Sequence, residues 1–267
     1  RGLKYICRAE QATRLLPFEF NTEQIYLLCL SDYKMKVFKD DRCIAELETP
    51  WSGNQLFQLN YTQSADTLLL VHPDVPPKQV NRNNNEVWLI SDWEYYTKDD
   101  MIYMPYYNFY QKKPQLWASG TSGEITMATD ADVFLSAHVG SYLKYQSGLV
   151  KITEVRGPRD IAGTVIKKLS ATGKTNDWAE AAFSDARGWP VSVTFHQNRM
   201  VIGGSRDLPN RLWLSKSSDL FNFDLGKAVD DDAIEFGILS DQVNAIKAVV
   251  STRHLLVFTT GAEWMGS

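Results

Sequence analysis

The sequence is poor in cysteine and carries no strong excess of charge of either sign. Its three cysteines, Cys7, Cys29 and Cys43, form an odd set without ligand-like spacing, which argues against a disulfide framework and against a zinc site. Cys29 falls among apolar residues of an expected strand, so we expect it to be a buried structural thiol. The formal net charge of -4 gives the chain no general basic footprint for nucleic acid. No apolar run approaches the roughly 18 residues that a membrane-spanning helix needs.

Familiar catalytic and nucleotide-binding motifs are also missing. The sequence contains no GxxxxGK loop, no GxGxxG after a strand, no HExxH pair and no GxSxG elbow. The four histidines are scattered, at His72, His138, His196 and His254. His196 and His254 fall at or just after the turn of two related segments, which favours a shared structural role over a metal site. The sequence therefore gives no positive reason to predict an enzyme, a cofactor or a metal site.

What the sequence does contain is a repeated strand pattern. In residues 190–202, Val191, Val193 and Phe195 alternate with polar residues, and a polar turn and an apolar run follow. The same order of alternating strand, polar turn and apolar strand recurs at residues 25–38, 57–71 and 246–258. In the weakest copy, the alternating apolar set is Ile25, Leu27 and Cys29. An aromatic content of 12% also favours strands over a helical bundle.

Four degenerate copies of one antiparallel unit predict a partial or complete β-propeller. The third strands around Trp88 and Trp213 recur as well, and we expect these two residues and Arg199 to serve the architecture. A β-sandwich of ordinary hairpins is the alternative. Residues 73–77 and 81–85, rich in proline and asparagine, are expected to be solvent-exposed loops.

The repeat is interrupted in the middle of the chain. Residues 142–145 and 149–152 flank Gln146-Ser147-Gly148 as a short hairpin, and residues 163–169 read as another strand. Residues 175–183 suggest one short helical turn, and residues 241–246 a turn or short helix. We therefore predict a small antiparallel barrel or sheet inserted between blades.

The predicted domains are the first propeller blades at residues 1–116, the inserted small β-barrel-like domain at 117–186 and further blades at 187–267. The chain starts at Arg1 without a methionine and ends within a copy of the repeat. We therefore expect a fragment of a longer protein.

Three groups of residues are candidate binding or catalytic sites. The aromatic-rich stretch 95–110 could stack on bases or sugars, although packing against its own protein or a neighbouring subunit is the favoured interpretation. The acidic residues 230–232 could bind a divalent cation, although a solvated turn is favoured. A glycosidase needs two facing carboxylates, and the spacing of the available ones predicts nothing specific. The carboxylates considered are Asp66, Asp74, Glu86 and Glu94.

Several motifs resemble the nozzle (tail tubular protein B-like) proteins of short-tailed bacteriophages. That family shows an aromatic residue, a short Asn-Arg turn, an apolar strand ending in small residues, then Ser-Arg/Lys, Phe-Asn-Phe and an acidic stretch. The matching segments here are residues 195–204, 213–217, 221–223 and 230–234, with further similarity at 244–246, 255–258 and 261–264. Residues 132–134 and 138–142 are similar to small barrel modules of phage tail proteins. The resemblance is clearest over about the last 80 residues.

The resemblance implies a structural component of the phage tail, located in the virion and assembled in the cytoplasm of the bacterial host. Such nozzles are usually hexameric, stack beneath an adaptor ring and form a conduit for genome ejection. The implied partners are therefore other copies of the chain, the adaptor, the fibres, and phage DNA that passes without sequence-specific binding.

Two other functions compete with this expectation. One is a carbohydrate-binding or polysaccharide-degrading propeller, for which the stretch 95–110 is the candidate site. The other is a protein-interaction propeller of the WD or kelch type, whose sequence signatures are missing here.

Overall fold

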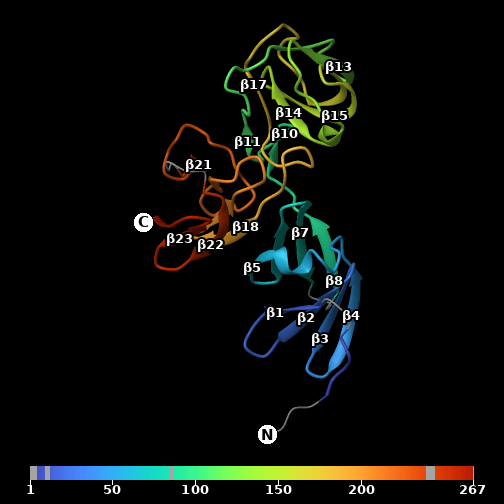
Figure 1. Cartoon of the computed structure of the whole chain (residues 1–267), viewed down its shortest axis with the longest axis vertical. Coiled ribbons are helices and arrows are strands. Elements are labelled where there is room, and N and C mark those ends of the chain that lie inside the picture. Colours follow the sequence, from blue (N-terminus) through green and yellow to red (C-terminus); the bar gives the residue numbers. More distant parts are fainter. Residues whose placement is uncertain (1–4, 10–12, 84–86, 239–243, 267) are drawn as a thin grey trace.

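The structure, a computed structural model, describes residues 5–9, 13–83, 87–238 and 244–266. The protein is mainly β, as the sequence predicted, and its strands form several antiparallel sheets. Figure 1 shows four of these sheets, made from consecutive strands, and a further sheet inserted after the second of them. Helical structure in the described part of the chain is confined to two short 3-10 turns, η1 (Leu56–Gln58) and η2 (Ser136–His138).

The four sheets share one topology, in which each strand pairs with its neighbour in the sequence. The first sheet comprises β1 (Arg14–Glu19), β2 (Ile25–Ser31), β3 (Lys34–Lys39) and β4 (Arg42–Glu48). The second comprises β5 (Asn60–Ser64), β6 (Thr67–His72), β7 (Val75–Arg82) and β8 (Trp88–Asp92). The third comprises β18 (Ser192–His196), β19 (Arg199–Gly203), β20 (Arg211–Leu214) and β21 (Ile234–Gly237). The fourth comprises β22 (Ile246–Ser251), β23 (Leu255–Thr259) and β24 (Glu263–Gly266).

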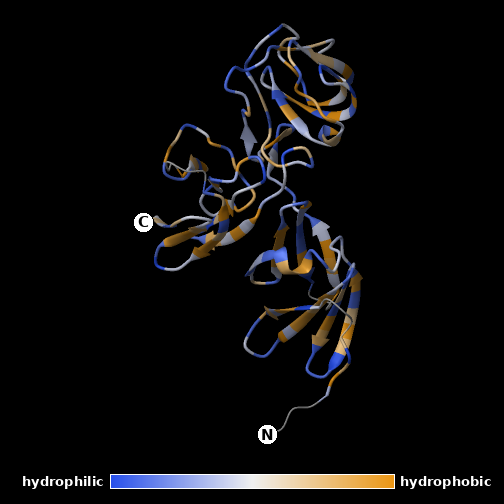
Figure 2. Cartoon of the chain, viewed as in Figure 1, coloured by the Kyte–Doolittle hydropathy of each residue, from blue (hydrophilic) through white to orange (hydrophobic). Residues whose placement is uncertain are grey.

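All four predicted hairpins are confirmed. β2 pairs with β3, β5 with β6, β18 with β19 and β22 with β23, each antiparallel. Gln197 and Asn198, between β18 and β19, have positive φ angles of 46° and 60°. Two consecutive positive φ angles are typical of a tight two-residue hairpin turn, and asparagine tolerates that conformation well. Figure 2 shows the resulting pattern, with hydrophobic residues on the strands and hydrophilic residues at many of the turns.

The four sheets pack on one another in sequence order and share three hydrophobic cores. The first and second sheets bury a core that contains Leu28, Leu70 and Trp88, and the second and third bury Leu69, Val71 and Trp213. The third and fourth sheets enclose a smaller core. Its buried members are Val201, Leu212, Leu214, Ile238, Ile246, Val249, Leu255 and Val257. The sheets thus form a stack, in which each one lies against the next.

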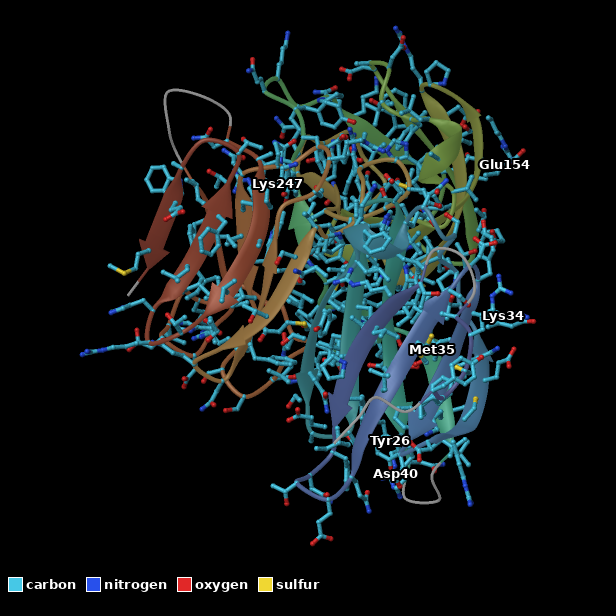
Figure 3. All side chains as sticks on the ribbon, turned by 60° about the horizontal axis from the view of Figure 1, so that its bottom comes forward. Tyr26, Lys34, Met35, Asp40, Glu154 and Lys247 are labelled. Carbon is cyan, nitrogen blue, oxygen red and sulfur yellow. The ribbon has the colours of Figure 1, made fainter. Side chains whose placement is uncertain are left out.

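The position of each sheet in the stack explains its sequence pattern. β6 and β19 are buried on both faces, because the second and third sheets lie inside the stack, and both read as continuous apolar runs. β3 belongs to an end sheet and alternates instead. Its neighbours Lys34 and Met35, labelled in Figure 3, are exposed and fully buried respectively. The burial of both faces of β6 and β19 thus follows from their inner position, although β2 of an end sheet is also apolar on both faces.

Polar side chains join the first strands of successive sheets. Arg14 of β1 donates to the main-chain oxygens of Leu56 and Leu59, just before β5. Asn60 Oδ1 of β5 accepts hydrogen bonds from Ser192 Oγ at 3.2 Å and from the Val193 N–H at 2.9 Å. Ser192 Oγ in turn accepts a hydrogen bond from the main-chain N–H of Val249 on β22 at 2.9 Å. The first strands of all four sheets consequently adjoin along one side of the stack.

The inserted sheet has seven strands, and several of them pair with strands that are distant in the sequence. In spatial order these are β11 (Tyr106–Tyr107), β17 (Trp178–Ala181), β14 (Tyr142–Tyr145), β15 (Gly148–Gly157), β16 (Asp160–Lys167), β13 (Glu124–Thr129) and β12 (Leu116–Ala118). The sheet curls around its own core, seen at the top of Figure 1. A small hairpin, β9 (Thr97–Lys98) with β10 (Met101–Ile102), precedes it. The sheet thus begins at Tyr106, before the predicted start at residue 117.

Several local predictions were wrong. The expected loop 73–77 and polar run 81–85 overlap the two ends of the strand β7, in which Val75, Pro77, Val80 and Arg82 are buried. Residues 84–86 lie outside the described residues. The predicted helical turn at 175–183 contains β17. In both segments, strand pairing satisfies the main-chain hydrogen bonds, and the start of β7 accommodates its two prolines. Of the predicted turn or short helix at 241–246, residues 241–243 lie outside the described residues, and Ile246 begins the strand β22.

The phase of β2 was also wrong. Tyr26, Leu28 and Leu30 face the core, whereas Ile25 and Leu27 lie on the exposed face and the thiol of Cys29, which forms no disulfide, is half-buried. Both phases of β2 are apolar, so alternation could not identify the inner face.

Candidate functional site: a buried polar junction and an adjoining cleft

The carboxylate of Glu180 is at the centre of a buried polar junction with four hydrogen-bond contacts. It lies on β17 with its side chain only 1% exposed. Its Oε1 accepts hydrogen bonds from Tyr110 Oη and Arg187 Nη2, both at 2.8 Å. Its Oε2 lies 2.8 Å from Arg187 Nε and 3.1 Å from His138 Nε2. A buried charge is tolerated only when it is paired and hydrogen-bonded, and both oxygens here are.

Arg187 connects this carboxylate to the stack. It stands in the turn that follows the inserted sheet and leads to β18, and its Nη1 lies 3.4 Å from Asp207 Oδ2 in the β19–β20 loop. The guanidinium also lies over the ring of Phe109, 4.1 Å from its centroid. A planar guanidinium can bind a carboxylate through two parallel hydrogen bonds and stack on a ring at once. Glu180 and Arg187 therefore fasten the inserted sheet to the third sheet.

The charges at this junction are held by their surroundings. Burial alone would raise the pKa of Glu180, but hydrogen bonds from His138 and Arg187 outweigh it and lower that pKa. Burial would lower the pKa of Arg187, and its contacts with Glu180 raise it instead. Burial, followed by the neighbouring Glu180 charge, raises the pKa of Tyr110. Glu180 is thus ionised and fully bonded, which suits a structural clamp better than a general base.

A cleft of about 620 Å³ lies close to this junction. Its walls come from the second sheet, the β9–β10 hairpin, residues 139–142 of the insert and residues 183–189. Five aromatic residues take part in the lining, and they are Trp93, Tyr95, Tyr142, Phe183 and Trp189. A volume of this size lies within the range typical of small-molecule sites.

Four charged side chains line the same cleft. Lys78 pairs with Asp92 across β7 and β8, and Asp185 accepts a hydrogen bond from Trp189 Nε1 at 2.8 Å. Glu94 follows β8 and is exposed. Three carboxylates and one ammonium give the lining a formal charge of about -2. The cleft thus combines flat apolar faces with hydrogen-bond acceptors.

The aromatic stretch 95–110 is mostly packed against its own chain, as the favoured interpretation expected. Tyr95 contacts Phe223 edge-on, with centroids 6.0 Å apart, and Tyr107 contacts Phe109 in the same way at 5.1 Å. The hydroxyl of Tyr107 accepts a hydrogen bond from Arg211. Most of this stretch therefore joins the insert to the stack, and its contribution to the cleft is Tyr95, Thr97, Ile102, Met104 and Pro105.

The acidic triplet 230–232 forms a turn held by basic residues. Arg199 donates to the main-chain oxygens of Asp230 and Asp232, and Lys216 Nζ lies 3.0 Å from Asp232 Oδ1. Asp232 Oδ2 accepts from two main-chain N–H groups of the same turn. The predicted turn is present, but Asp232 is buried and ion-paired instead of solvated. Arg199 has the architectural role that the sequence suggested.

The histidines take up different positions. His196 Nδ1 lies 3.0 Å from Ser251 Oγ and links the third sheet to the fourth, whereas His254 sits in the β22–β23 turn. His138 belongs to the Glu180 junction, and His72 is buried where β6 ends, with burial lowering its pKa. Among the described residues, no three His, Cys, Asp or Glu side chains gather closely enough to hold a metal ion.

The carboxylates considered for glycosidase chemistry do not form one pair. Asp66 and Asp74 flank opposite ends of β6, about 20 Å apart at the usual rise per strand residue. Glu94 lines the cleft, and Glu86 lies outside the described residues. Sequence reasoning missed the Glu180 junction. The available signal was a single acidic residue within an otherwise small and aromatic segment, residues 178–183.

Comparisons with known proteins add no identification. No model of a known protein family matches the chain, and no curated protein matches it at a significant level of similarity. Within the described residues, no helix has the length and apolar character needed to cross a membrane.

Proposed function

We propose that this chain is a structural component of a bacteriophage tail, a nozzle or tail-tube subunit that forms part of the conduit for genome ejection. Two lines of reasoning support the proposal. The motifs around residues 195–234 resemble those of nozzle proteins, and the sheets carrying them form a stack with bonded junctions. The best-connected charges, at Glu180 and Arg187, fasten parts of the fold together.

The stack has the features of an incomplete β-propeller. Propeller blades are four-stranded meanders placed around an axis, with their first strands innermost. Here the first strands β1, β5, β18 and β22 adjoin through the bonds of Arg14, Asn60 and Ser192. We infer that the four sheets are successive blades of a propeller.

The observation that carries the proposal is that apolar side chains are exposed on both end faces of the stack. On the first sheet they are Leu15, Ile25 and Leu27 of β1 and β2, while β3 and β4 present Lys34, Lys36, Glu46 and Glu48 on the same face. The outer face of the fourth sheet carries Val250, Leu256, Phe258 and Met265. Exposed apolar groups bordered by charged ones are typical of protein–protein interaction sites. Further sheets of the same kind therefore continue the stack in the assembled tail, as three successive cores already do within this chain.

The partners follow from this role. They are other copies of the chain in a ring, the adaptor and fibre proteins of the tail, and DNA that passes without sequence-specific contacts. A net charge of -4 suits passage, because a strongly basic wall would hold the phosphates and slow the DNA. A continuous Lys/Arg lining of the channel would contradict this part of the proposal.

The assembly mass of the protein tests the proposal directly. Light scattering and negative-stain imaging would measure it, alone and with the adaptor. A ring with an open channel, weakened by Phe258→Asp on the outer face of the fourth sheet, is the expected result. Leu135→Asp, at an exposed position of the insert, serves as the matched control. A monomer under both conditions would overturn the proposal.

A carbohydrate-binding protein is the alternative function, and the cleft is the observation that favours it. Degradation of the polysaccharide has weaker support, because the sequence-predicted carboxylates Asp66 and Asp74 are far apart. Binding in the cleft is also compatible with a tail component.

A further inference from the structure

We propose that the cleft between the second sheet and the inserted sheet binds a neutral oligosaccharide. This binding function goes beyond the structural role proposed above and does not depend on it. The cleft is large enough, at about 620 Å³, to enclose a small ligand, and it lies where three parts of the fold meet.

Two indole rings form fixed walls of the cleft. Trp93 Nε1 donates to the main-chain oxygen of Lys78 at 2.9 Å, and Trp189 Nε1 donates to Asp185 Oδ1 at 2.8 Å. The main-chain N–H of Trp189 also donates to the Pro73 oxygen at 2.9 Å. Each ring is therefore positioned before any ligand arrives, and such preorganisation lowers the entropic cost of binding.

The lining matches the two kinds of surface on a sugar ring. The partly exposed rings of Trp189 and Tyr142 suit the C–H faces of a hexose, because an aromatic ring offers a large contact area with a negative face, whereas Trp93 is buried and contributes little surface. Glu94 and Asp185 provide carboxylate oxygens, which accept hydrogen bonds from hydroxyl groups. The alternation of apolar face and polar edge favours a saccharide over a purely apolar ligand.

The charge of the lining selects the class of saccharide. Asp92, Glu94 and Asp185 carry three negative charges against the single positive charge of Lys78. A lining of about -2 repels phosphates and uronates in a partly desolvated site. The cleft is therefore selective for neutral glycans over nucleic acid and over acidic polysaccharides.

The cleft is not the site that the carbohydrate alternative named from the sequence. That candidate was the stretch 95–110, for which packing was the favoured interpretation, and most of its rings are packed within the fold. The cleft instead combines Trp93, Tyr142 and Trp189, which are far apart in the sequence.

Isothermal titration calorimetry and tryptophan fluorescence would test the proposal. The probes are neutral tri- to pentasaccharides of glucose, galactose or N-acetylglucosamine, compared with oligogalacturonate, single-stranded DNA and a proline-rich peptide. We expect binding of a neutral glycan, weakened about tenfold or more in Tyr142→Ala through loss of ring contact. Glu94→Gln should weaken it less and should relax the discrimination against oligogalacturonate.

Matched controls make the outcome decisive. Tyr33→Ala removes an exposed tyrosine in a turn of the first sheet and should leave the affinity unchanged. Circular dichroism and the unfolding midpoint would establish that Tyr142→Ala is folded. Absence of binding to every neutral glycan would overturn the proposal, as would binding that Tyr142→Ala and Glu94→Gln leave intact or binding of the peptide alone. None of these outcomes bears on the assembly mass, so the two proposals fail separately.

Discussion

The stack and the inserted sheet are both antiparallel, yet they are held together differently. In the stack, strands pair in sequence order, and the junctions between sheets combine an apolar core with hydrogen bonds to neutral groups, from Arg14 to main-chain oxygens at the first junction and through Ser192 at the next two. In the inserted sheet, the edge strand β11 pairs with β17, which lies some 70 residues later. That edge is secured by the buried charges of Glu180 and Arg187. Local pairing therefore needs little polar reinforcement, whereas the long-range closure of the insert depends on an ion pair.

The difference also affects how the two regions respond to substitution. A neutral hydrogen bond contributes about 1 kcal/mol, and losing one partner costs about the desolvation of the group left behind. A buried charge that loses its partner costs more, because the remaining charge is unpaired in a medium of low polarity. We therefore expect the most sensitive polar residue to lie in the insert.

Replacing Glu180 by glutamine should have the largest effect. The change leaves Arg187 without its carboxylate, and we expect the free energy of unfolding to fall by about 3–5 kcal/mol. Urea unfolding followed by fluorescence would measure it. Glu154→Gln is the matched control, because Glu154 pairs with Arg156 in the same sheet but is exposed, as Figure 3 shows at its outer edge. Equal effects of the two substitutions would show that the junction does not secure the insert.

Leu28 and Leu27 offer a comparison within the stack. Leu28 is fully buried between the first two sheets, whereas Leu27, the next residue, is 41% exposed on the outer face. We expect Leu28→Ala to lower the free energy of unfolding by about 2–5 kcal/mol and Leu27→Ala by less than about 1 kcal/mol. Thermal and urea unfolding of the isolated chain would measure both. The reverse order would mean that β2 has the opposite phase.

The sequence could predict the stack because its pairings are local. Each hairpin brings together residues that a short polar turn separates, such as Gln197 and Asn198 between β18 and β19. The missed strand β7 begins with Val75-Pro76-Pro77, a composition that signals a loop when its neighbours are unknown. Its place beside β6 and β8 is set by tertiary pairing. Local patterns therefore gave the hairpins but not every strand.

The junction and the cleft could not be predicted for a related reason. Tyr110, His138, Glu180 and Arg187 converge from four separate segments, and no spacing in the sequence connects them. The cleft likewise draws Trp93 and Tyr142 from different sheets. A site formed between the inserted sheet and the stack depends on how the two pack against each other. The periodicity of residues along the sequence does not determine that packing.

Ser192 tests the neutral junctions of the stack. Ser192→Ala removes a hydrogen bond to Asn60 and leaves the main-chain N–H of Val249 without its acceptor. We expect a loss of about 1–3 kcal/mol in the free energy of unfolding, smaller than that for Glu180→Gln. Ser64→Ala, an exposed serine on β5, should change it by no more than about 0.5 kcal/mol. A loss matching that of Glu180→Gln would remove the contrast between the two regions.

The pH dependence of the free energy of unfolding should show the smallest effect, and the one most specific to Glu180. The folded-state pKa of Glu180 is lowered, so its stabilising contribution is complete above the unfolded carboxyl pKa of about 4.3. That contribution is lost as the pH falls through the lower folded pKa. The difference in unfolding free energy between the parent protein and Glu180→Gln should thus be constant between about pH 5.5 and 7 and should shrink below about pH 4.3.

Urea unfolding at successive pH values would measure this difference, with Glu154→Gln as a control that stays near the parent protein throughout. Each unit by which the pKa is lowered adds about 1.4 kcal/mol to the stability present at neutral pH, so the extent of the decrease reports how strongly the junction holds the charge. A difference that instead changes between pH 5.5 and 7 would show that the dependence does not come from the Glu180 carboxylate, and the ion pair with Arg187 would then no longer be the dominant polar contact of the inserted sheet.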